Sequence, residues 1–504
     1  MKENAMQTAS YLDTYLSKNN PTKPSKAAIA YLASLDHLSE SNPEIAGMIT
    51  QEIRDQRSHL KMIASENYSS LDVQLAMGNL LTDKYAEGYP FHRFYAGCDN
   101  VDAIEQLAVD RAKSLFNADH AYVQPHSGAD ANLVAFWAIL LKNVQNKELE
   151  RLGKKSVDAC NPEEYEAIRQ LLVNQKLLGM SLNSGGHLTH GFRHNVSSKM
   201  MKASFYDVDP KTELLDYGQI LARAREERPT ILLAGYSAHT RKINFAKMKE
   251  IAESVGATLM VDMAHFAGLV AGGVFEHEFN PIPFADIVTT TTHKTLRGPR
   301  GGMILCTNEY AEFVNKGCPL VLGGPLPHVI AAKACAFKEA LQPDFSLYAR
   351  KVVANAQALA NGLSKRGLRL ISGGTENHMV IIDISKYAIT GRQAEIALRS
   401  AHITVNRNAI PFDSNGPWYT SGIRLGAPAL TTLGMGEKEM ALIADCIADT
   451  LQATSALPAP DGSASKSLCV TDEVVLSRVQ RQIAELLQSF VLYPELCIDD
   501  ANQV

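Results

Sequence analysis

Between about residues 56 and 341, short apolar runs alternate with longer segments in which apolar residues recur at helical spacing. The runs are short and rich in valine, isoleucine, leucine and threonine, which is typical of buried strands. Alternating strands and helices predict a mainly parallel sheet covered by helices, and ligands bind at the carboxyl ends of the strands in such sheets. The expected strands include residues 121–124, 230–235, 258–262 and 286–290.

The chain on either side of this large domain, residues 56–341, has a different pattern. Residues 1–55 are polar and interrupted by prolines, which predicts an N-terminal arm outside the core. Residues 342–504 begin with a long helical pattern that leads into apolar runs, which predicts a smaller α+β domain. The charged residues 143–177 are predicted to be a helical insertion, and the proline-, glycine- and serine-rich stretch at about 455–472 a flexible linker.

Composition narrows the class of protein. The chain has 504 residues, of which 46% are hydrophobic and 20% charged, which is usual for a globular protein of about two domains. A net charge of −5 without a dense basic run predicts no nucleic-acid partner, and no run of about 18 apolar residues predicts no membrane partner. The first residues lack an apolar signal-peptide core, and the eight cysteines include no C-x-x-C pair. We therefore expect reduced thiols and a cytoplasmic location.

The most specific chemical signal is Lys294, which follows the predicted strand that ends in four threonines and which begins a glycine-rich turn. A lysine in such a place can form a Schiff base with a bound carbonyl compound. Asp262 ends another predicted strand. An aspartate that pairs with a ring nitrogen and a lysine that forms a Schiff base are the groups that bind pyridoxal phosphate (PLP), so the pair predicts this cofactor.

Two glycine-containing turns add candidates for the same site. Ser127 and Gly128 follow a strand and open a helix, whose N-terminal N–H groups favour a phosphate. The turn 184–191 contains three glycines and two histidines, and we expect His187 to stack on a flat ring. A metal site at His187 and His190 is the alternative, but no carboxylate or thiol lies nearby in sequence, so we predict no metal.

Two further residues have the chemistry of an amino-acid site. Glu87 lies in an aromatic-rich loop, residues 84–98, where burial would favour its neutral form and suit a general acid–base; an interface loop is an equally compatible reading. Arg424 is expected on a short strand between two glycines, and an arginine binds a carboxylate with two parallel hydrogen bonds.

Six motifs together resemble the serine hydroxymethyltransferases, which are PLP enzymes of fold type I. The motifs are Ile63–Tyr68, Lys84–Pro90, Val261–His265, Thr289–Thr295, Gly323–Leu326 with His328, and Thr420–Gly426. The resemblance implies a large domain with a mainly parallel seven-stranded sheet and a smaller α+β C-terminal domain. It implies reversible conversion of L-serine and tetrahydrofolate to glycine and 5,10-methylenetetrahydrofolate through aldimine and quinonoid intermediates, in a homodimer with shared active sites.

The resemblance also implies a role for each residue that matches a family motif. Lys294 corresponds to the aldimine lysine, Asp262 to the partner of the ring nitrogen, His187 to the stacking histidine and Thr291 to a catalytic hydroxyl. The remaining cofactor positions are Ser127, Gly128, Ser237, His265 and His293, with Tyr85, Gly323 and Gly324 from a second subunit. The amino-acid substrate positions are Ser65, Glu87, Tyr95, His265 and Arg424, and the folate positions are Leu182, Gly186, His187, Leu188 and Asn408.

The chain departs from the family pattern around the cofactor phosphate and folate. The departures are Ala129 and Asp130, Phe94, Ser184 and Leu322. These departures alter the expected folate pocket. The residues alone therefore leave two alternatives to the family's reaction. One is a folate-independent aldolase or racemase that acts on amino acids with PLP. The other is a non-catalytic binding protein, which the complete set of reactive side chains disfavours.

Overall fold

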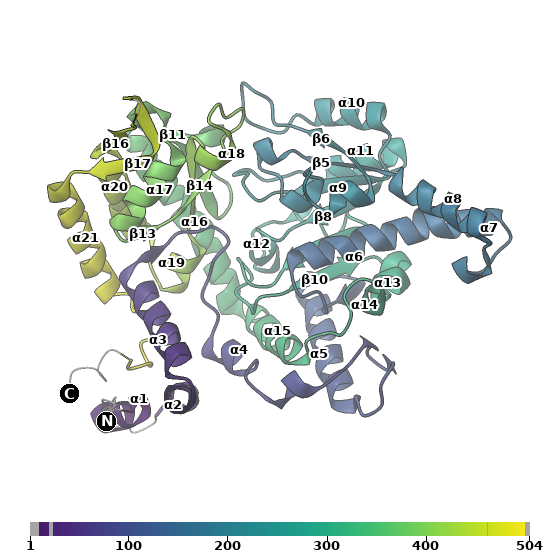
Figure 1. The fold of residues 1–504 in the computed structure, drawn as a ribbon, viewed down its shortest axis with the longest axis horizontal. Helices are drawn as coiled ribbons and strands as arrows, with labels where there is room; N and C mark the ends of the chain where they lie inside the picture. Colours follow the sequence, from purple (N-terminus) through teal and green to yellow (C-terminus); the bar gives the residue numbers. More distant parts are fainter. Residues whose placement is uncertain (1–9, 20–23, 461, 499–504) are drawn as a thin grey trace.

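A seven-stranded sheet forms the centre of the molecule, in the strand order β4-β10-β9-β8-β7-β5-β6 (Figure 1). The computed structural model describes residues 10–19, 24–460 and 462–498. Six strands run parallel, and β10 is antiparallel to both of its neighbours, so the predicted mainly parallel sheet is confirmed. In chain order the strands are β4 (His120–Tyr122), β5 (Lys176–Met180), β6 (Lys202–Tyr206), β7 (Ile231–Gly235), β8 (Thr258–Asp262), β9 (Ile287–Thr291) and β10 (Gly302–Cys306).

Helices cover both faces of this sheet, which explains why its central strands are buried along their whole length. Alternate side chains of β8 enter different clusters: Leu259 and Val261 pack in one and Met260 in the other. The helices that pack around the sheet include α5 (Asp99–Phe116), α6 (Gly128–Leu140), α10 (Tyr217–Glu227), α11 (Phe245–Val255), α12 (Ala267–Ala271), α13 (Asn308–Asn315) and α15 (Pro327–Ala340).

A separate hydrophobic cluster lies around a second, antiparallel sheet in the order β11-β12-β15-β14. Its strands are β11 (Arg369–Leu370), β12 (Met379–Asp383), β14 (Asn406–Asn408) and β15 (Gly422–Gly426), and its helices include α17 (Gly391–Ser400), α20 (Glu437–Gln452) and α21 (Glu473–Gln488). The long helix α16 (Pro343–Lys365) joins the two cores, because Phe345 packs in the first and Leu359 in the second.

The packing of the chain just after residue 56 does not follow the predicted start of the large domain. Leu60 and Met62, which the pattern places in the large domain, pack in the second cluster. Strand β1 (Leu60–Lys61) pairs in parallel with β13 (Ile403–Thr404), so the chain enters the large domain only after it has contacted the C-terminal one. The exact domain limits stay a prediction.

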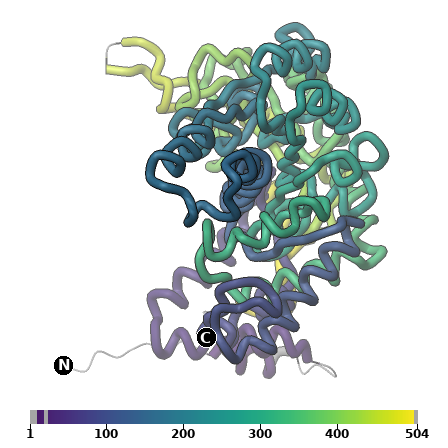
Figure 2. The backbone as a smooth tube through the Cα atoms, turned by 90° about the vertical axis from the view of Figure 1, so that its right-hand side faces the viewer, coloured from purple at the N-terminus to yellow at the C-terminus, as the bar shows by residue number. Residues whose placement is uncertain are grey.

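The N-terminal helices α1 (Tyr11–Asn19), α2 (Lys26–Ser41) and α3 (Pro43–Ser58) lie together at the lower end of the molecule (Figure 2). They have a small cluster of their own, which includes Leu32, Leu35 and, from near the C-terminus, Leu496 and Ile498. They therefore pack outside the two main cores. No helix in the described ranges has both the length and the apolar composition that a membrane crossing requires.

The insertion at 143–177 is helical, as predicted, and α7 (Asn146–Arg151) and α8 (Pro162–Val173) form the right-hand edge of Figure 1. The predicted flexible linker at about 455–472 is wrong. Strands β16 (Thr454–Pro458) and β17 (Ala464–Thr471) pair there as an antiparallel hairpin. The buried side chain of Gln393 donates 2.7 Å hydrogen bonds to the carbonyls of Ser465 and Leu468, which fixes β17 against α17.

Candidate active site

The residues that the sequence places at strand ends meet in one cavity of about 230 Å³ at the carboxyl edge of the large sheet. Its walls comprise Ser127, Gly128, Ala129, His187, Tyr236, Ser237, Asp262, Ala264, His265, Thr291, His293, Lys294 and Arg300. An adjoining opening is lined by several of these residues and by Ser65, Glu66, Leu182, Gly186, Leu188 and Arg424. Topology thus assembles predicted cofactor, substrate and folate residues from seven separate parts of the chain.

Asp262 ends β8 and is 7% exposed, and its carboxylate is bound from three directions. Asn132 Nδ2 donates to Oδ2 at 2.9 Å, His190 Nε2 lies 3.1 Å from the same oxygen, and the Ala264 N–H donates to Oδ1 at 3.0 Å. Burial acts to raise the pKa of Asp262, but the hydrogen bond and charge of His190, with those of His187 and Asn132, outweigh it and hold this pKa well below its usual range. Asp262 is therefore an ionised, oriented acceptor inside the cavity.

His190 orients Asp262 and was identified from the sequence only as a possible metal ligand. Its Nδ1 accepts from the His187 N–H at 3.3 Å, which leaves Nε2 to donate to the Asp262 carboxylate. The ligand atoms of these three residues lie within 4.8 Å of one another. The sequence argument against a metal considered neighbours in the sequence only, whereas Asp262 lies close to both histidines in space. Hydrogen bonds join these residues in the structure, and the absence of a metal stays a prediction.

Lys294 lies three residues beyond β9 and is 9% exposed. Burial lowers the pKa of its ammonium to about 8, against the opposing attraction of Asp262. An amine with this pKa is partly neutral near physiological pH, which makes it nucleophilic. Asn67 Nδ2 donates to the Lys294 carbonyl at 3.0 Å and fixes the backbone from which the side chain enters the cavity.

Three histidines that line the cavity are neutral imidazoles at physiological pH. Burial is the main cause: it lowers the pKa of His187 to about 4, that of His293 to about 3 and that of His265 well below its ordinary value. Nδ1 of His187 contacts the Thr189 hydroxyl at 2.7 Å, and Nδ1 of His265 lies 3.2 Å from Nε2 of the buried His378. A second side chain thus contacts the ring of His187 and that of His265, and all three histidines that line the cavity are uncharged.

A candidate anion cradle lies where β4 passes into α6. Ser127 caps α6, and its hydroxyl accepts from the Asp130 N–H at 3.1 Å. The cradle is closely packed: a Cβ on Gly302 would lie 2.2 Å from the Ser127 carbonyl, and a Cβ on Gly128 would lie 2.7 Å from the Thr291 methyl. The guanidinium-bearing Arg300 lines the same cavity. N–H groups at a helix start and a nearby cation fit a phosphate.

Arg424 extends from β15 into the opening beside Lys294. Its Nε donates to Asn406 Oδ1 at 3.2 Å, and another guanidinium nitrogen donates to the Ser237 carbonyl. Burial lowers its pKa to about 10, so the side chain stays charged at neutral pH. No acidic side chain in the described part of the chain forms an ion pair with it, which leaves its charge available to a carboxylate ligand.

Besides Asn408, five predicted site residues lie outside this cavity and its adjoining opening: Tyr85, Glu87, Tyr95, Gly323 and Gly324. Tyr85 and Tyr95 are 56% and 48% exposed and touch edge to face at 4.9 Å, and a Cβ on Gly324 would contact the Tyr85 ring at 3.5 Å. Glu87 is half-buried, so the expectation that aromatic side chains bury it does not hold within one chain. The reason is that residues 84–98 turn outward as the hairpin of β2 (Gly88–Tyr89) and β3 (His92–Arg93).

The structure also places Asn408, on β14, outside the residues that line the cavity; its amide donates to the Ala409 carbonyl at 2.6 Å. Sequence reasoning missed Asn132, although a signal existed. Asn132 is the one polar residue in the apolar stretch 131–140 of α6, and a buried polar residue at such a position needs partners.

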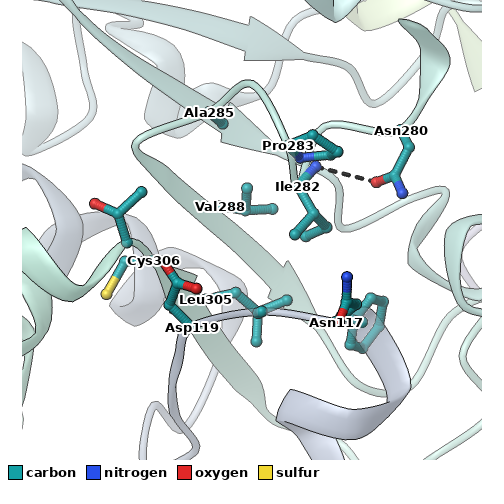
Figure 3. A pocket seen from close by; sticks show the side chains of 12 residues that line it. Asn117, Asp119, Asn280, Ile282, Pro283, Ala285, Val288, Leu305 and Cys306 are labelled. Carbon is teal, nitrogen blue, oxygen red and sulfur yellow. Dashed lines mark hydrogen bonds between the residues drawn. The ribbon is translucent and has the colours of Figure 1, made fainter. Parts of the chain in front are cut away.

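A second cavity, of about 260 Å³, lies at the opposite end of the strands (Figure 3). It lies near the starts of β4 and β9 and the end of the antiparallel β10, with Asp119, Ile282 and Cys306 among its walls. It therefore lies at the amino edge of the parallel strands. Since ligands of such sheets bind at the carboxyl edge, the Lys294 cavity is the candidate active site.

Comparison with known proteins agrees with this geometry. The family model described as serine hydroxymethyltransferase matches residues 38–150 and 151–447. A serine hydroxymethyltransferase of Treponema pallidum (strain Nichols) is 56% identical over 487 residues, which cover 97% of this chain and 85% of that protein. The enzyme of the same name from Chlamydia muridarum (strain MoPn / Nigg) is 56% identical over 492 residues, and that from Chlamydia trachomatis serovar D is 55% identical over 493; both matches cover 97% of this chain and 99% of the relative.

Proposed function

This chain belongs to the serine hydroxymethyltransferase family, and from that premise we propose that it interconverts L-serine plus tetrahydrofolate with glycine plus 5,10-methylenetetrahydrofolate. The observation that carries the proposal is the placement of Lys294 between Asp262, in the cavity at the carboxyl edge of the sheet, and Arg424, in the adjoining opening; Lys294 lines both. A buried amine, an ionised carboxylate and a free guanidinium together suit an enzyme that binds both a carbonyl cofactor and an amino acid.

The residues present fit PLP, the cofactor that the fold-type I family uses. Ser127 and Gly128 would hold its phosphate, Asp262 its protonated ring nitrogen, His187 its ring face and Lys294 its carbonyl carbon. When bound, the cofactor supplies an electron-accepting ring conjugated to the amino group of the substrate. The fit rests on the ionised state of Asp262, because only a carboxylate that stays charged keeps a ring nitrogen protonated.

The chain's own side chains orient the amino acid and manage its protons. Arg424 would bind the substrate carboxylate, and this contact would orient the bonds to the α-carbon. Ser65 and His265 line the same opening and would contact the substrate. The partly neutral Lys294 would accept or return a proton at its Nζ, and the hydroxyl of Thr291, which donates to the Ala264 carbonyl at 3.2 Å, belongs to a residue that lines the same cavity.

The five residues outside the cavity support a homodimer with shared active sites. The exposed Tyr85 and Tyr95 and the half-buried Glu87 would enter the opening of a second copy, with Gly323 and Gly324 beside the cofactor phosphate there. Glu87 would then move protons between the serine hydroxyl, the one-carbon unit and folate. Subunit mixing tests this: inactive Lys294→Ala and Glu87→Gln proteins should regain turnover when co-refolded. Failure to regain it would contradict sharing.

Tetrahydrofolate would bind beside Leu182, Gly186 and Leu188 in the adjoining opening, and Asn408 is the remaining proposed folate residue. The Ser184 hydroxyl, where the family pattern has histidine, donates to Asp207 at 2.7 Å and ties this loop down. No disulfide bond joins cysteines within the described ranges, which supports the further proposal of a cytoplasmic location, where thiols stay reduced.

The deciding experiment is glycine formation from L-serine by purified, PLP-loaded protein, with and without tetrahydrofolate. Strong stimulation by tetrahydrofolate is the expected result, and the Lys294→Ala variant should show none. Equal rates with and without tetrahydrofolate would replace the proposal by a folate-independent aldolase or racemase. A protein without turnover and without a visible absorption band would be a non-catalytic binder.

A further inference from the structure

The hairpin loop of residues 84–98 is exposed on its outer side and rigidly bound on its inner side. Phe91 and Phe94 are 69% and 68% exposed. In contrast, the side chain of Arg93, from strand β3 of the same hairpin, is only 3% exposed. The same hairpin therefore exposes two phenylalanines to solvent and buries an arginine, and the contacts of this arginine indicate what the loop does.

The Arg93 guanidinium binds the backbone on both sides of Glu87. One of its nitrogens donates to the Ala86 and Gly88 carbonyls, both at 2.9 Å. The peptide between Glu87 and Gly88 is bound as well, because the Glu87 carbonyl accepts from the Phe94 N–H at 3.0 Å. Three consecutive peptide groups around Glu87 are therefore fixed, which determines the direction in which its side chain leaves the loop.

Two carboxylates of α5 hold the guanidinium itself in place. Asp102 accepts from Arg93 Nε at 2.8 Å, and Glu105 accepts from the third nitrogen at 2.7 Å. All three guanidinium nitrogens of Arg93 therefore donate hydrogen bonds. A lysine, which has one ammonium nitrogen, cannot form the same set. Glu105 is 1% exposed, so the pair is fully desolvated and its geometry is strict.

Gln124 connects this network to the cofactor cradle of the same chain. Its amide donates to the Gly88 carbonyl and to Glu105, both at 2.7 Å, and its oxygen accepts from the Tyr122 hydroxyl at 2.9 Å. Gln124 lies three residues before Ser127, the cap of α6. Gln124 thus binds the backbone next to Glu87 and lies in the segment that leads from β4 into the cradle.

We propose that Arg93 is a positioning residue for the reaction: with Glu105 and Gln124 it sets the backbone of Glu87, and so the place of the Glu87 carboxylate in the active site that the loop completes. This inference rests on the proposed function, in which Glu87 transfers protons. A displacement of a catalytic group by about 1 Å costs on the order of 100-fold in rate, so a loosened loop should have a kinetic phenotype.

The test is a double-variant cycle on the PLP-loaded enzyme with serine and tetrahydrofolate. Arg93→Lys should lower kcat by about 100-fold while bound PLP and the serine KM change by less than about 3-fold. Arg93→Lys/Glu87→Gln should be no slower than Glu87→Gln alone, because residues that act through one another are not additive. A purely structural role of Arg93 would instead multiply the two losses.

Arg111→Lys is the matched control. Arg111 lies in α5 and, like Arg93, donates to a backbone carbonyl, that of Ala334 at 2.7 Å, but among the described residues no hydrogen bond or ion pair joins it to the loop. It should keep wild-type kcat. If Arg93→Lys does not fold, Gln124→Leu, which removes one bond to Gly88, decides by the same cycle with a smaller loss.

The outcomes separate this inference from the function on which it rests. Wild-type kcat in Glu87→Gln would overturn the proton-transfer role of Glu87 and the inference with it. A slow Glu87→Gln beside a wild-type Arg93→Lys, or two losses that multiply, would overturn the role of Arg93 alone.

Discussion

The side-chain amide of Asn132 donates a 2.9 Å hydrogen bond to the carboxylate of Asp262, although the two residues lie 130 positions apart in the chain. The same amide donates to the Thr189 hydroxyl at 2.7 Å, and the Thr289 hydroxyl donates to the Asn132 oxygen at 2.6 Å. One buried side chain therefore joins α6, the turn that carries His187 and His190, and two neighbouring strands of the sheet.

Asn132→Ala should lower both stability and PLP affinity. Without the Asn132 amide, the buried Thr189 and Thr289 hydroxyls and the Asp262 carboxylate each lose a hydrogen bond. The free energy of unfolding should fall by about 1–3 kcal/mol. The dissociation constant of PLP should rise by about tenfold, since one bond that orients Asp262 is lost. Denaturant unfolding and a cofactor titration measure the two effects.

Asn143→Ala separates the effect on stability from the effect on PLP affinity. Asn143 continues the same helical segment, but its amide binds Thr258, at the end of β8 away from Asp262, and Tyr310 of α13. It should lose stability without loss of PLP affinity. Equal losses of affinity in the two variants would show that Asn132 acts only through stability.

Lys294 should make the cofactor-free protein less stable below about pH 8. Its folded pKa of about 8 lies below its ordinary value of 10.5, because burial disfavours the charged form. Between these two values the unfolded chain binds more protons than the folded one, so Lys294 makes stability rise with pH in this window. Below the window its buried charge costs up to about 3 kcal/mol.

Lys294→Met should therefore be more stable than the parent at pH 7, and the difference should shrink as the pH rises from 8 to 10.5. Unfolding of the two cofactor-free proteins in denaturant across this range gives the measurement. Lys438→Met is the control, since Lys438 is exposed on α20. A pH-independent difference between Lys294→Met and the parent would refute the lowered pKa.

Arg424→Ala should weaken serine binding by about 100-fold or more, because it removes the cation that pairs with the substrate carboxylate in a buried site. PLP binding should change little, since Arg424 contacts Asn406 and the Ser237 carbonyl rather than the anion cradle. Serine-induced spectral change measures the first quantity and cofactor content the second. Arg407→Ala, on the neighbouring β14 and paired with Glu395, is the control. Unaltered serine affinity in Arg424→Ala would exclude the assigned role.

Gly302→Ala should abolish tight PLP binding. The new Cβ would lie 2.2 Å from the Ser127 carbonyl, so the turn that caps α6 must move. Gly47→Ala has no atom within 4 Å of its new Cβ and lies inside α3, where alanine is favoured by about 0.5–1 kcal/mol. It should retain the cofactor and gain a little stability. Normal cofactor content in Gly302→Ala would mean that the cradle is not at this turn.

The sequence by itself determined the sheet, the strand ends and the reactive side chains placed there. Asp262 and Lys294 are recognisable because a run of apolar or β-branched residues precedes each, and strand periodicity is a local property of the chain. Arg424 was recognised because two glycines flank its short predicted strand. Local composition misled at 455–472, because the proline, glycine and serine residues of a hairpin turn are also those of a linker, and only pairing with the partner strand and Gln393 distinguishes them.

Only the tertiary structure decided which groups set the chemistry of those side chains. The low pKa of Asp262 depends on His190 and Asn132, and the pKa of Lys294 near 8 depends on burial by several elements. The outward direction of the loop that carries Glu87 likewise depends on Arg93, Glu105 and Gln124, which meet from separate elements. Desolvation and hydrogen bonding act between atoms that are close in space, and their strength is set only when distant segments of the chain have packed together.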